Sequence, residues 1–169
     1  MDVETAIRTR RTHKQYHPHP VDRSTVGEVL ELARWAPNHH LTQPWRFRVL
    51  GPETLARLKA AAGEKEAAKL DRAPTLVVAS AVLSGDPVQD EEDLHATACA
   101  VYAVLLAATA RGLASYWRTP GALRDPRVCS ELGLPREERF VALIHLGMPR
   151  AEPPAKERAP VDEYLSFLA

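Results

Sequence analysis

The segment with the greatest density of hydrogen-bonding side chains is APNHHLTQPWRF, residues 36 to 47. Asn38, His39, His40 and Gln43 lie here between a predicted helix and a predicted strand. A loop that only connects two elements is usually shorter. Amide and imidazole groups can donate and accept hydrogen bonds, as the polar edge of a planar ring requires. We therefore expect this loop to hold a planar cofactor.

A second segment, Arg10-Arg11-Thr12-His13-Lys14, gathers cations and a hydroxyl group within one turn. Arginine can bind a phosphate through two parallel hydrogen bonds, and lysine adds a compact positive charge. The segment therefore suits an anion, although a solvated basic turn is the more common explanation of such a composition. No glycine-rich phosphate loop accompanies it, so a P-loop or Rossmann nucleotide site is not supported.

The histidines raise the question of a metal site. Adjacent histidines on an extended chain, as at His39 and His40, point in opposite directions and rarely bind one ion. His17 and His19 belong to the segment HPHP, and neither an HExxH motif nor a third ligand at a diagnostic spacing is present. We therefore expect no metal, and expect one loop histidine to bond the backbone of its own loop.

Trp117, Arg118 and Thr119 end a predicted strand with an aromatic ring, a charge and a hydroxyl group. Such strand ends often hold ligands, although Trp117 could equally belong to the core. Serine or cysteine hydrolase chemistry has little support. The sequence has no GxSxG motif, and neither Cys99 nor Cys129 lies in an activating context.

Composition narrows the class of protein. The 169 residues predict one domain, 1–169, and the 22 basic residues balance 22 acidic ones, which argues against a nucleic-acid partner. The apolar run 96–110 is interrupted by polar residues and falls short of the ~20 residues of a membrane span. The segment 1–10 has no apolar core of a secretory signal, and the two cysteines have no CxxC spacing. We expect a cytoplasmic protein with no membrane partner.

Apolar periodicity and capping residues predict the elements that position these segments. Strands are expected at residues 45–50, 75–83, 114–119 and 140–148. Helices are expected at residues 2–9, from Asp22 or Ser24 up to Pro37, at 53–70 as an exposed amphipathic helix, at 89–112, and near 126–132.

The predicted helix 89–112 is unusual because, after its acidic first turns, it is apolar on nearly every face. Acids near the start are favourable against the helix dipole, and Gly112 occupies the position of a C-terminal cap. A helix that is apolar all round lies in a core or at a subunit interface. The proline-rich tail ends in Tyr164, Leu165, Phe167 and Leu168, so we expect it to pack on a surface, such as that of a partner subunit.

Three segments, in this order along the chain, resemble the FMN-dependent nitroreductases. Residues 10–16, RRTHKQY, are similar to that family's RRSxRxF pattern, and residues 36–47 are similar to its APSxxNxQPWxF. Residues 112–119, FVALIHLGMP and KERAPVDEY resemble its later strands and its C-terminal end. The likeness covers essentially the whole chain. It is greatest to the small single-domain NAD(P)H nitroreductases, whose loop reads APDHxxxQPWxF and whose later strand ends in Trp-Arg-Ser.

The resemblance implies an α+β, three-layer fold with a central, mainly antiparallel sheet flanked by helices. It implies a homodimer with FMN at the interface. Arg10, Arg11 and Thr12 would meet the FMN phosphate and ribityl chain, and Lys14 would lie near N1 and O2 of the ring. The other implied contacts are His39 and Gln43 from the loop, Trp117, Arg118 and Thr119 from the other subunit, Arg158 with or without Lys156 at the phosphate, and Trp35 beside the same pocket.

The implied activity is an NAD(P)H oxidoreductase that reduces nitroaromatics, quinones or similar acceptors in a ping-pong reaction. NADH or NADPH would be the donor, and flavin N5 would carry the hydride, so no protein acid or base is required. A lysine near N1 and O2 favours the negatively charged reduced flavin. Two departures are evident. Leu41 stands at the family's asparagine position, and the chain is short between Ser84 and Gln89, where larger members insert helices over the substrate.

Three alternatives remain open. One is a specialised flavin enzyme of the same superfamily, such as a dehalogenase or a flavin-cleaving enzyme. The short chain at residues 84–89 provides no lid and disfavours a dehalogenase. A second is a flavin-binding or redox-sensing module with little turnover. The third is a metal-binding scaffold that uses the histidines of HPHP and of the loop.

Overall fold

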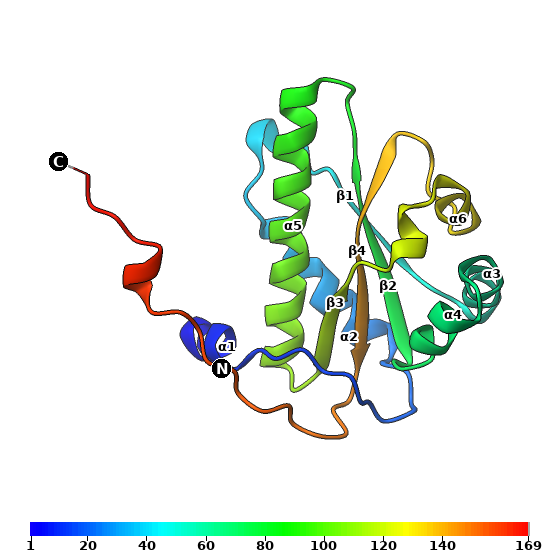
Figure 1. The fold of residues 1–169 in the computed structure, drawn as a ribbon, viewed down its shortest axis with the longest axis horizontal. Coiled ribbons are helices and arrows are strands. Elements are labelled where there is room, and N and C mark those ends of the chain that lie inside the picture. The colour runs from blue at the N-terminus through cyan, green and yellow to red at the C-terminus, as the bar shows by residue number, and fades with distance from the viewer. Residues whose placement is uncertain (169) are drawn as a thin grey trace.

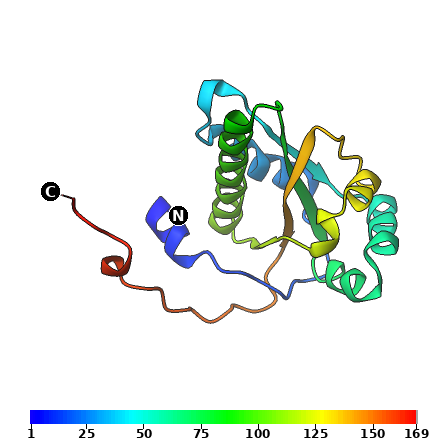
Figure 2. The same cartoon turned by 45° about the horizontal axis from the view of Figure 1, so that its top comes forward.

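The computed structural model describes residues 1–168, with a four-stranded antiparallel sheet at the centre (Figure 1). The strand order is β1-β2-β4-β3. The strands are β1 (Trp45–Val49), β2 (Thr75–Val82), β3 (Ala114–Arg118) and β4 (Glu138–Gly147), and each neighbouring pair is antiparallel. Helices cover both faces (Figure 2). The predicted α+β fold with a flanked antiparallel sheet is confirmed, as are all four strands.

The central strand β2 explains why its sequence is a continuous apolar run. It pairs with β1 on one side and β4 on the other. Helices lie over both of its faces, so Thr75 through Ala81 are all buried. A strand covered on both faces loses the alternation of polar and apolar residues that a half-exposed strand shows.

The long helix α5 (Pro87–Ala110) lies along one face of the sheet. It begins at Asp86, whose carboxylate accepts hydrogen bonds from the backbone N–H groups of Val88 and Gln89. It ends before Gly112, whose φ of 72° suits a glycine cap. One side of the helix is buried in the core, while Cys99 and Tyr102 on another side are exposed.

By length and composition alone, α5 could cross a membrane, which the interrupted apolar run did not lead us to expect. The helix has 24 residues, and one 18-residue window has a mean hydropathy of 1.4. Half of that window is buried inside the fold. The packing of α5 across the sheet is that of a core helix.

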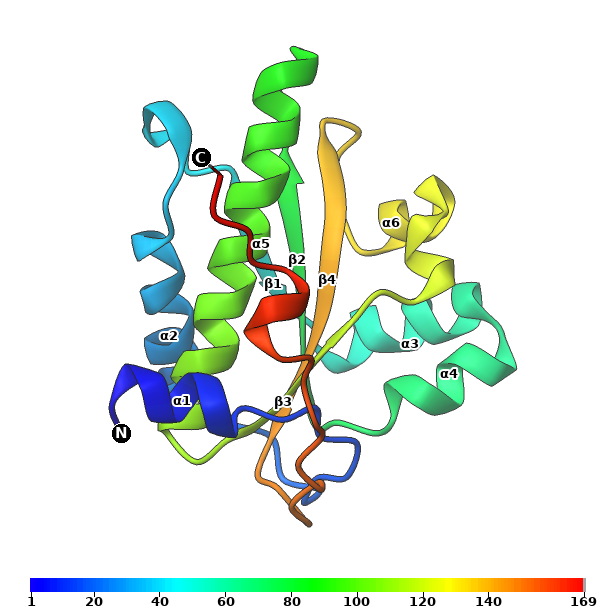
Figure 3. The ribbon, with the colours of Figure 1, turned by 60° about the vertical axis from the view of Figure 1, so that its left-hand side comes forward.

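The remaining helices divide between the two faces (Figure 3). On the α5 side lie α1 (Val3–Thr9), α2 (Arg23–Glu31) and the short turns Leu32–Trp35 and His39–Leu41. On the other side lie α3 (Pro52–Ala62), α4 (Glu64–Leu70), the turn Gly121–Arg124 and α6 (Pro126–Glu131). Asp22, not Ser24, caps α2 through its hydrogen bond from the Thr25 N–H.

The prediction of one helix over residues 53–70 is wrong. Two helices, α3 and α4, replace it and meet at Gly63. The φ of Gly63 is 78°, a left-handed conformation that glycine adopts readily and that interrupts a right-handed helix. The charge pattern alone carried no sign of the break.

The N-terminal segment after α1 is held along the edge of the sheet. Thr12 forms a parallel bridge with Ser115 of β3, and the His13 N–H donates to the Ser115 carbonyl at 3.1 Å. Tyr16 bridges Pro149, just beyond β4, and its hydroxyl group donates to the His13 carbonyl at 2.8 Å. Residues 10–16 are thereby fixed against the strand whose end was expected to hold a ligand.

The C-terminal tail leaves the body of the molecule beyond α1 (Figures 1 and 2). A short turn, Val161–Glu163, interrupts it. Tyr164, Phe167 and Leu168 are all more than 70% exposed, so the expected packing of these side chains finds no surface within one chain. Packing on a partner subunit stays a prediction.

Gly147 is required where β4, Tyr16 and Pro74 meet. A Cβ atom at position 147 would lie 2.9 Å from Tyr16 Cδ1 and 3.0 Å from the Pro74 ring. We expect Gly147→Ala to lower the free energy of unfolding by about 1–3 kcal/mol, the usual cost of overpacking. Urea denaturation measures this, with Gly121→Ala as the control, because no atom lies within 4 Å of a Cβ there. Equal stabilities of the two variants would contradict the expected clash.

Candidate functional site

A cavity of about 680 Å³ opens between the N-terminal segment, β3 and the tail. We call it the basic cavity. Tyr116 of β3 lines it together with parts of residues 10–15 and 151–158. Five cations contribute to its wall, against the single acid Glu152: Arg10, Arg11, Lys14, Lys156 and Arg158.

The positive charge of the basic cavity is not neutralised by the protein. Within residues 1–168, none of its five cations forms an ion pair. The Arg11 guanidinium donates only to the backbone carbonyls of Arg8 and Arg10, at 2.5 and 3.1 Å. Clustered cations repel one another unless an anion joins them, and a cleft of one sign concentrates counter-ions. The residues present therefore fit a phosphate-bearing cofactor.

One aromatic residue, Tyr116, lines the basic cavity. The half-buried Tyr116 ring lies against His145 of β4, with ring centroids 5.6 Å apart. His145 is fully buried, and burial together with the nearby charges of Arg118 and Arg72 lowers its pKa to about 3. The histidine is therefore uncharged at neutral pH, and the neighbour of the Tyr116 ring carries no positive charge of its own. A flat ligand could thus meet an aromatic surface with its ring and cations with its anionic end.

The loop that follows α2 lies beside the N-terminal end of α5, whereas the N-terminal segment, which lines the basic cavity, lies near the C-terminal end of α5 (Figures 1 and 3). With 24 residues, α5 spans roughly 36 Å. His39 Nδ1 lies 2.8 Å from the Glu92 carboxylate, and the Thr42 hydroxyl donates to Asp93 at 2.5 Å. The observed partner of His39 is therefore an acid of α5. The hydrogen bond expected from one loop histidine to the backbone of its own loop is not found within residues 1–168.

Backbone strain marks the same loop. His40, Leu41 and Gln43 have φ values of 52°, 53° and 46°, in the left-handed region that disfavours residues with a Cβ. Such residues cost on the order of 1–3 kcal/mol each and persist where the surroundings hold them. Here the Asn38 side chain accepts a hydrogen bond from the Gln43 N–H at 2.9 Å. The loop therefore has a defined conformation that its own hydrogen bonds stabilise.

The three expected residues at the end of β3 point to different surroundings. Trp117 packs against the core beneath α5. Arg118 is only 9% exposed, and its guanidinium lies 3.2 Å from the Glu66 carboxylate of α4. Thr119 is exposed and lines a separate cavity beside α6. Trp35 lies on an apolar groove along the exposed side of α5.

Within one chain the structure therefore brings together only part of the predicted set. Arg10, Arg11, Thr12, Lys14 and Arg158 line the basic cavity, and so does Lys156. Trp35, His39, Gln43, Trp117, Arg118 and Thr119 do not. Moreover, β3 pairs with the N-terminal segment of the same chain, whereas the resemblance implies that its end serves the other subunit.

Sequence reasoning missed Gln15, Tyr116 and Glu152 as members of the cavity wall. For Tyr116 a signal was available. Side chains alternate along a strand, so Tyr116 and Trp117 point to opposite faces of the sheet. If Trp117 belongs to the core, Tyr116 is therefore the aromatic side chain on the other face. As for metal ions, no group of three or more His, Cys, Asp or Glu side chains within residues 1–168 is placed to bind one.

The comparisons with known proteins agree with this architecture. The sequence profile of the Nitroreductase family matches residues 7–69 and 61–148. This chain belongs to the nitroreductase family. The Bacillus subtilis protein YfhC, whose name assigns it provisionally to the NAD(P)H nitroreductases, is 29% identical over 171 residues, covering 92% of this chain and 88% of YfhC. The predicted resemblance to small nitroreductases is confirmed.

Solved structures of nitroreductase-type proteins superpose on almost the whole chain. A nitroreductase-like family protein of Bacillus cereus has a TM-score of 0.90 at 26% identity, covering 99% of this chain and 96% of that one. A protein of Desulfovibrio desulfuricans, provisionally assigned as a nitroreductase and crystallised with FMN, has a TM-score of 0.83 at 26% identity. That match covers 99% of this chain and 97% of the other.

The Arg118–Glu66 ion pair predicts a pH-dependent contribution to stability. Hydrogen bonding to Lys69, together with the charges of Lys69 and Arg118, holds the pKa of Glu66 below its ordinary value of 4.5. Ionised Glu66, paired with both Lys69 and Arg118, therefore stabilises the fold fully above pH 4.5, and this stabilisation is lost as the pH falls through the lower folded-state value. We expect Glu66→Gln to cost about 1–3 kcal/mol at pH 7, because it leaves the buried Arg118 charge unpaired.

Urea denaturation between pH 3 and 7 measures this effect. The difference between wild type and Glu66→Gln should shrink toward zero in acid. Glu64→Gln is the matched control, because Glu64 lies on the same helix, is exposed and forms no ion pair within the described chain. A gap of constant size across this pH range would contradict the assigned role of Glu66.

Proposed function

We propose that this nitroreductase is a single FMN-binding domain that acts as an NAD(P)H oxidoreductase, reducing nitroaromatics, quinones or similar acceptors. The observation that carries the proposal is the basic cavity, which five unpaired cations line together with the aromatic ring of Tyr116. Two comparisons support it. A relative at 29% identity is named, provisionally, as an NAD(P)H nitroreductase, and a related protein at 26% identity was crystallised with FMN.

The five cations and the Thr12 hydroxyl group of the basic cavity would contact different parts of FMN. Arg10, Arg11, Lys156 and Arg158 would bind the phosphate, for which guanidinium groups offer paired donors. The Thr12 hydroxyl would hydrogen-bond the ribityl chain. Lys14 would place its charge near N1 and O2 of the ring. Bound FMN supplies hydride transfer between NADH or NADPH and the acceptor, while the protein binds, orients and polarises, with no side chain needed as acid or base.

We infer that the site is completed by a second copy of the chain. The strained loop with His39 and Gln43 lies toward the opposite end of α5 from the N-terminal segment that lines the basic cavity of its own chain. A homodimer could bring that loop from one subunit to the cavity of the other. In this arrangement the N-terminal segment and β3 serve one flavin together, and the loop comes from across the interface.

Two surfaces favour such a dimer. The exposed side of α5 forms an apolar groove of about 480 Å³, lined among others by Trp35, Cys99 and Tyr102. The tail carries exposed Tyr164 and Phe167 away from the body of its own chain. Aromatic and aliphatic side chains in these positions gain most by being covered in an association of subunits.

An alternative is a flavin-binding or redox-sensing module with little turnover. It would use the same cavity and would bind FMN equally well. Steady-state oxidation of NADH and NADPH with added nitroaromatic or quinone acceptors separates the two. A rate of NADH or NADPH oxidation that rises with acceptor concentration supports an oxidoreductase. A reduced flavin that no acceptor reoxidises supports a binding or sensing module.

The phosphate assignment can be tested by removing one guanidinium group. We expect Arg10→Ala to weaken FMN binding by about 1.5–3 kcal/mol, the scale of a lost charge-assisted hydrogen bond. Quenching of FMN fluorescence during titration of the apoprotein measures the affinity. Arg8→Ala is the control, because Arg8 pairs with Glu4 and lies outside the cavity wall. Full affinity in Arg10→Ala would move the phosphate elsewhere.

The ring assignment can be tested through the reduction potential. Lys14→Met removes the positive charge expected near N1 and O2, so the reduced flavin should lose stabilisation. We expect a fall in the midpoint potential on the order of 30 mV, about 1.4 kcal/mol for two electrons. Spectroelectrochemical titration of the FMN-loaded variant measures it. A potential equal to that of wild type would remove Lys14 from this role.

A further inference from the structure

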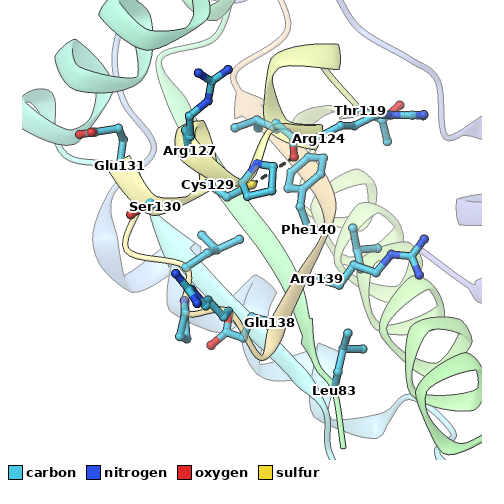
Figure 4. Close-up of a pocket in the computed structure, with 16 residues that line it drawn as sticks. Leu83, Thr119, Arg124, Arg127, Cys129, Ser130, Glu131, Glu138, Arg139 and Phe140 are labelled. Atoms are coloured by element: carbon cyan, nitrogen blue, oxygen red, sulfur yellow. Dashed lines mark hydrogen bonds between the residues drawn. The ribbon is translucent and has the colours of Figure 1, made fainter. Parts of the chain in front are cut away.

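A second and larger cavity lies beside α6, at the edge of β4 (Figure 4). Its volume is about 1380 Å³, and it shares no lining residue with the basic cavity. We call it the arginine cavity. Leucine, phenylalanine and valine side chains form its apolar surface, and four arginines surround them: Leu83, Leu123, Leu134, Phe140 and Val141, with Arg124, Arg127, Arg136 and Arg139.

The arginine cavity exists because β3 is short. Its last pair is Arg118 with Leu143, so the first residues of β4 have a partner strand on one side only. Phe140 and Val141 stand on this uncovered stretch and remain half-buried. An open strand edge with apolar side chains is ordinarily a liability in a protein. Here it forms the wall of a cavity.

The two carboxylates in the wall are already engaged. Glu138 accepts two hydrogen bonds from Arg48 of β1, at 2.7 and 2.9 Å, and another from Ser80. Although burial raises the pKa of Glu138, these bonds and the Arg48 charge hold it below its ordinary value. Glu131 faces Arg57 of α3 at 4.0 Å. Neither acid therefore neutralises the arginines of the cavity.

The arginines themselves differ. Arg127 is bound by Asp125 at 2.7 Å and points to solvent. Arg124, Arg136 and Arg139 have no carboxylate partner in the part of the chain that the structure describes. In Figure 4, Arg124 and Arg139 are drawn on the side of the cavity toward α5, above and below Phe140. Unpaired guanidinium groups beside an apolar surface are suited to an anion that has an apolar body.

The cysteine in the wall does not point to covalent chemistry. Cys129 Sγ lies 3.2 Å from the Leu123 carbonyl, to which it donates. Burial, with the charge of Asp125, raises the pKa of its thiol. A protonated and hydrogen-bonded thiol is a poor nucleophile. The arginine cavity is therefore equipped to bind rather than to react.

We propose that the arginine cavity binds a planar aromatic carboxylate. Arg124 and Arg139 would bind the carboxylate through paired N–H groups, as guanidinium geometry allows. The Phe140 ring and the neighbouring leucines would cover the aromatic body. The inference goes beyond the proposed function, since no residue that lines this site lines the basic cavity.

Naphthalene-2-carboxylate, whose fluorescence reports its own binding, is a suitable probe, and 2-naphthalenemethanol is its neutral counterpart. We expect the carboxylate to bind at least about tenfold more tightly than the alcohol, equivalent to ~1.4 kcal/mol. The double variant Arg124→Gln, Arg139→Gln should lose at least that factor for the carboxylate and little for the alcohol. Arg127→Gln is the matched control and should bind as wild type does.

Two further titrations with naphthalene-2-carboxylate keep the basic cavity from contributing to the signal. One uses wild type at saturating FMN, and the other uses the double variant Arg10→Gln, Arg158→Gln. The carboxylate should bind equally well in both. Loss of binding there would assign the probe to the basic cavity and overturn the proposal. Equal affinity for the two probes, undiminished binding by the Arg124, Arg139 double variant, or no binding at all would overturn it as well. Circular dichroism verifies that each variant is folded, and Arg124→Lys, Arg139→Lys retains the charge should the glutamines disturb the fold.

Discussion

The pairing of the short edge strand β3 with β4 is the constraint on which both cavities depend. The free side of β3 receives the N-terminal segment through the Thr12–Ser115 bridge, and this brings the cations of that segment over Tyr116. Because β3 stops at Arg118, the first half of β4 stays uncovered and forms the wall of the arginine cavity. One strand of five residues therefore helps to position the walls of both cavities.

Arginine side chains without carboxylate partners are common to the two cavities. Both cavities hold arginines that no carboxylate of the described chain neutralises, whereas Arg48 is paired with Glu138 and Arg118 with Glu66. Repulsion among like charges costs stability, which the fold tolerates at a solvent-exposed rim far better than in its core. The strained loop and the N-terminal segment that lines the basic cavity lie toward opposite ends of α5. A flavin site that uses both therefore needs two chains.

Much of the fold was predictable from local physics. Alternation marked the strand at residues 45–50, and an apolar run between Pro74 and Gly85 marked the strand at 75–83. Asp22 and Gly112 marked helix ends. The break at Gly63 was not predicted, because charge periodicity continues through it and only backbone conformation differs. The clustering of Arg10, Lys14 and Arg158 came from family resemblance, since no local rule joins residues so distant in sequence. The arginine cavity depends on where β3 ends relative to β4, a tertiary fact without a motif.

The most direct test of the central claim is the visible spectrum of the purified protein titrated with FMN, followed by anaerobic addition of NADH or NADPH. If the basic cavity is a flavin site in an oxidoreductase, the flavin bands will shift as FMN binds and will bleach when the donor is added. If FMN leaves the protein unchanged and its own spectrum unperturbed, the cations of the basic cavity serve another anion, and the assignment of this nitroreductase as a flavin enzyme is contradicted.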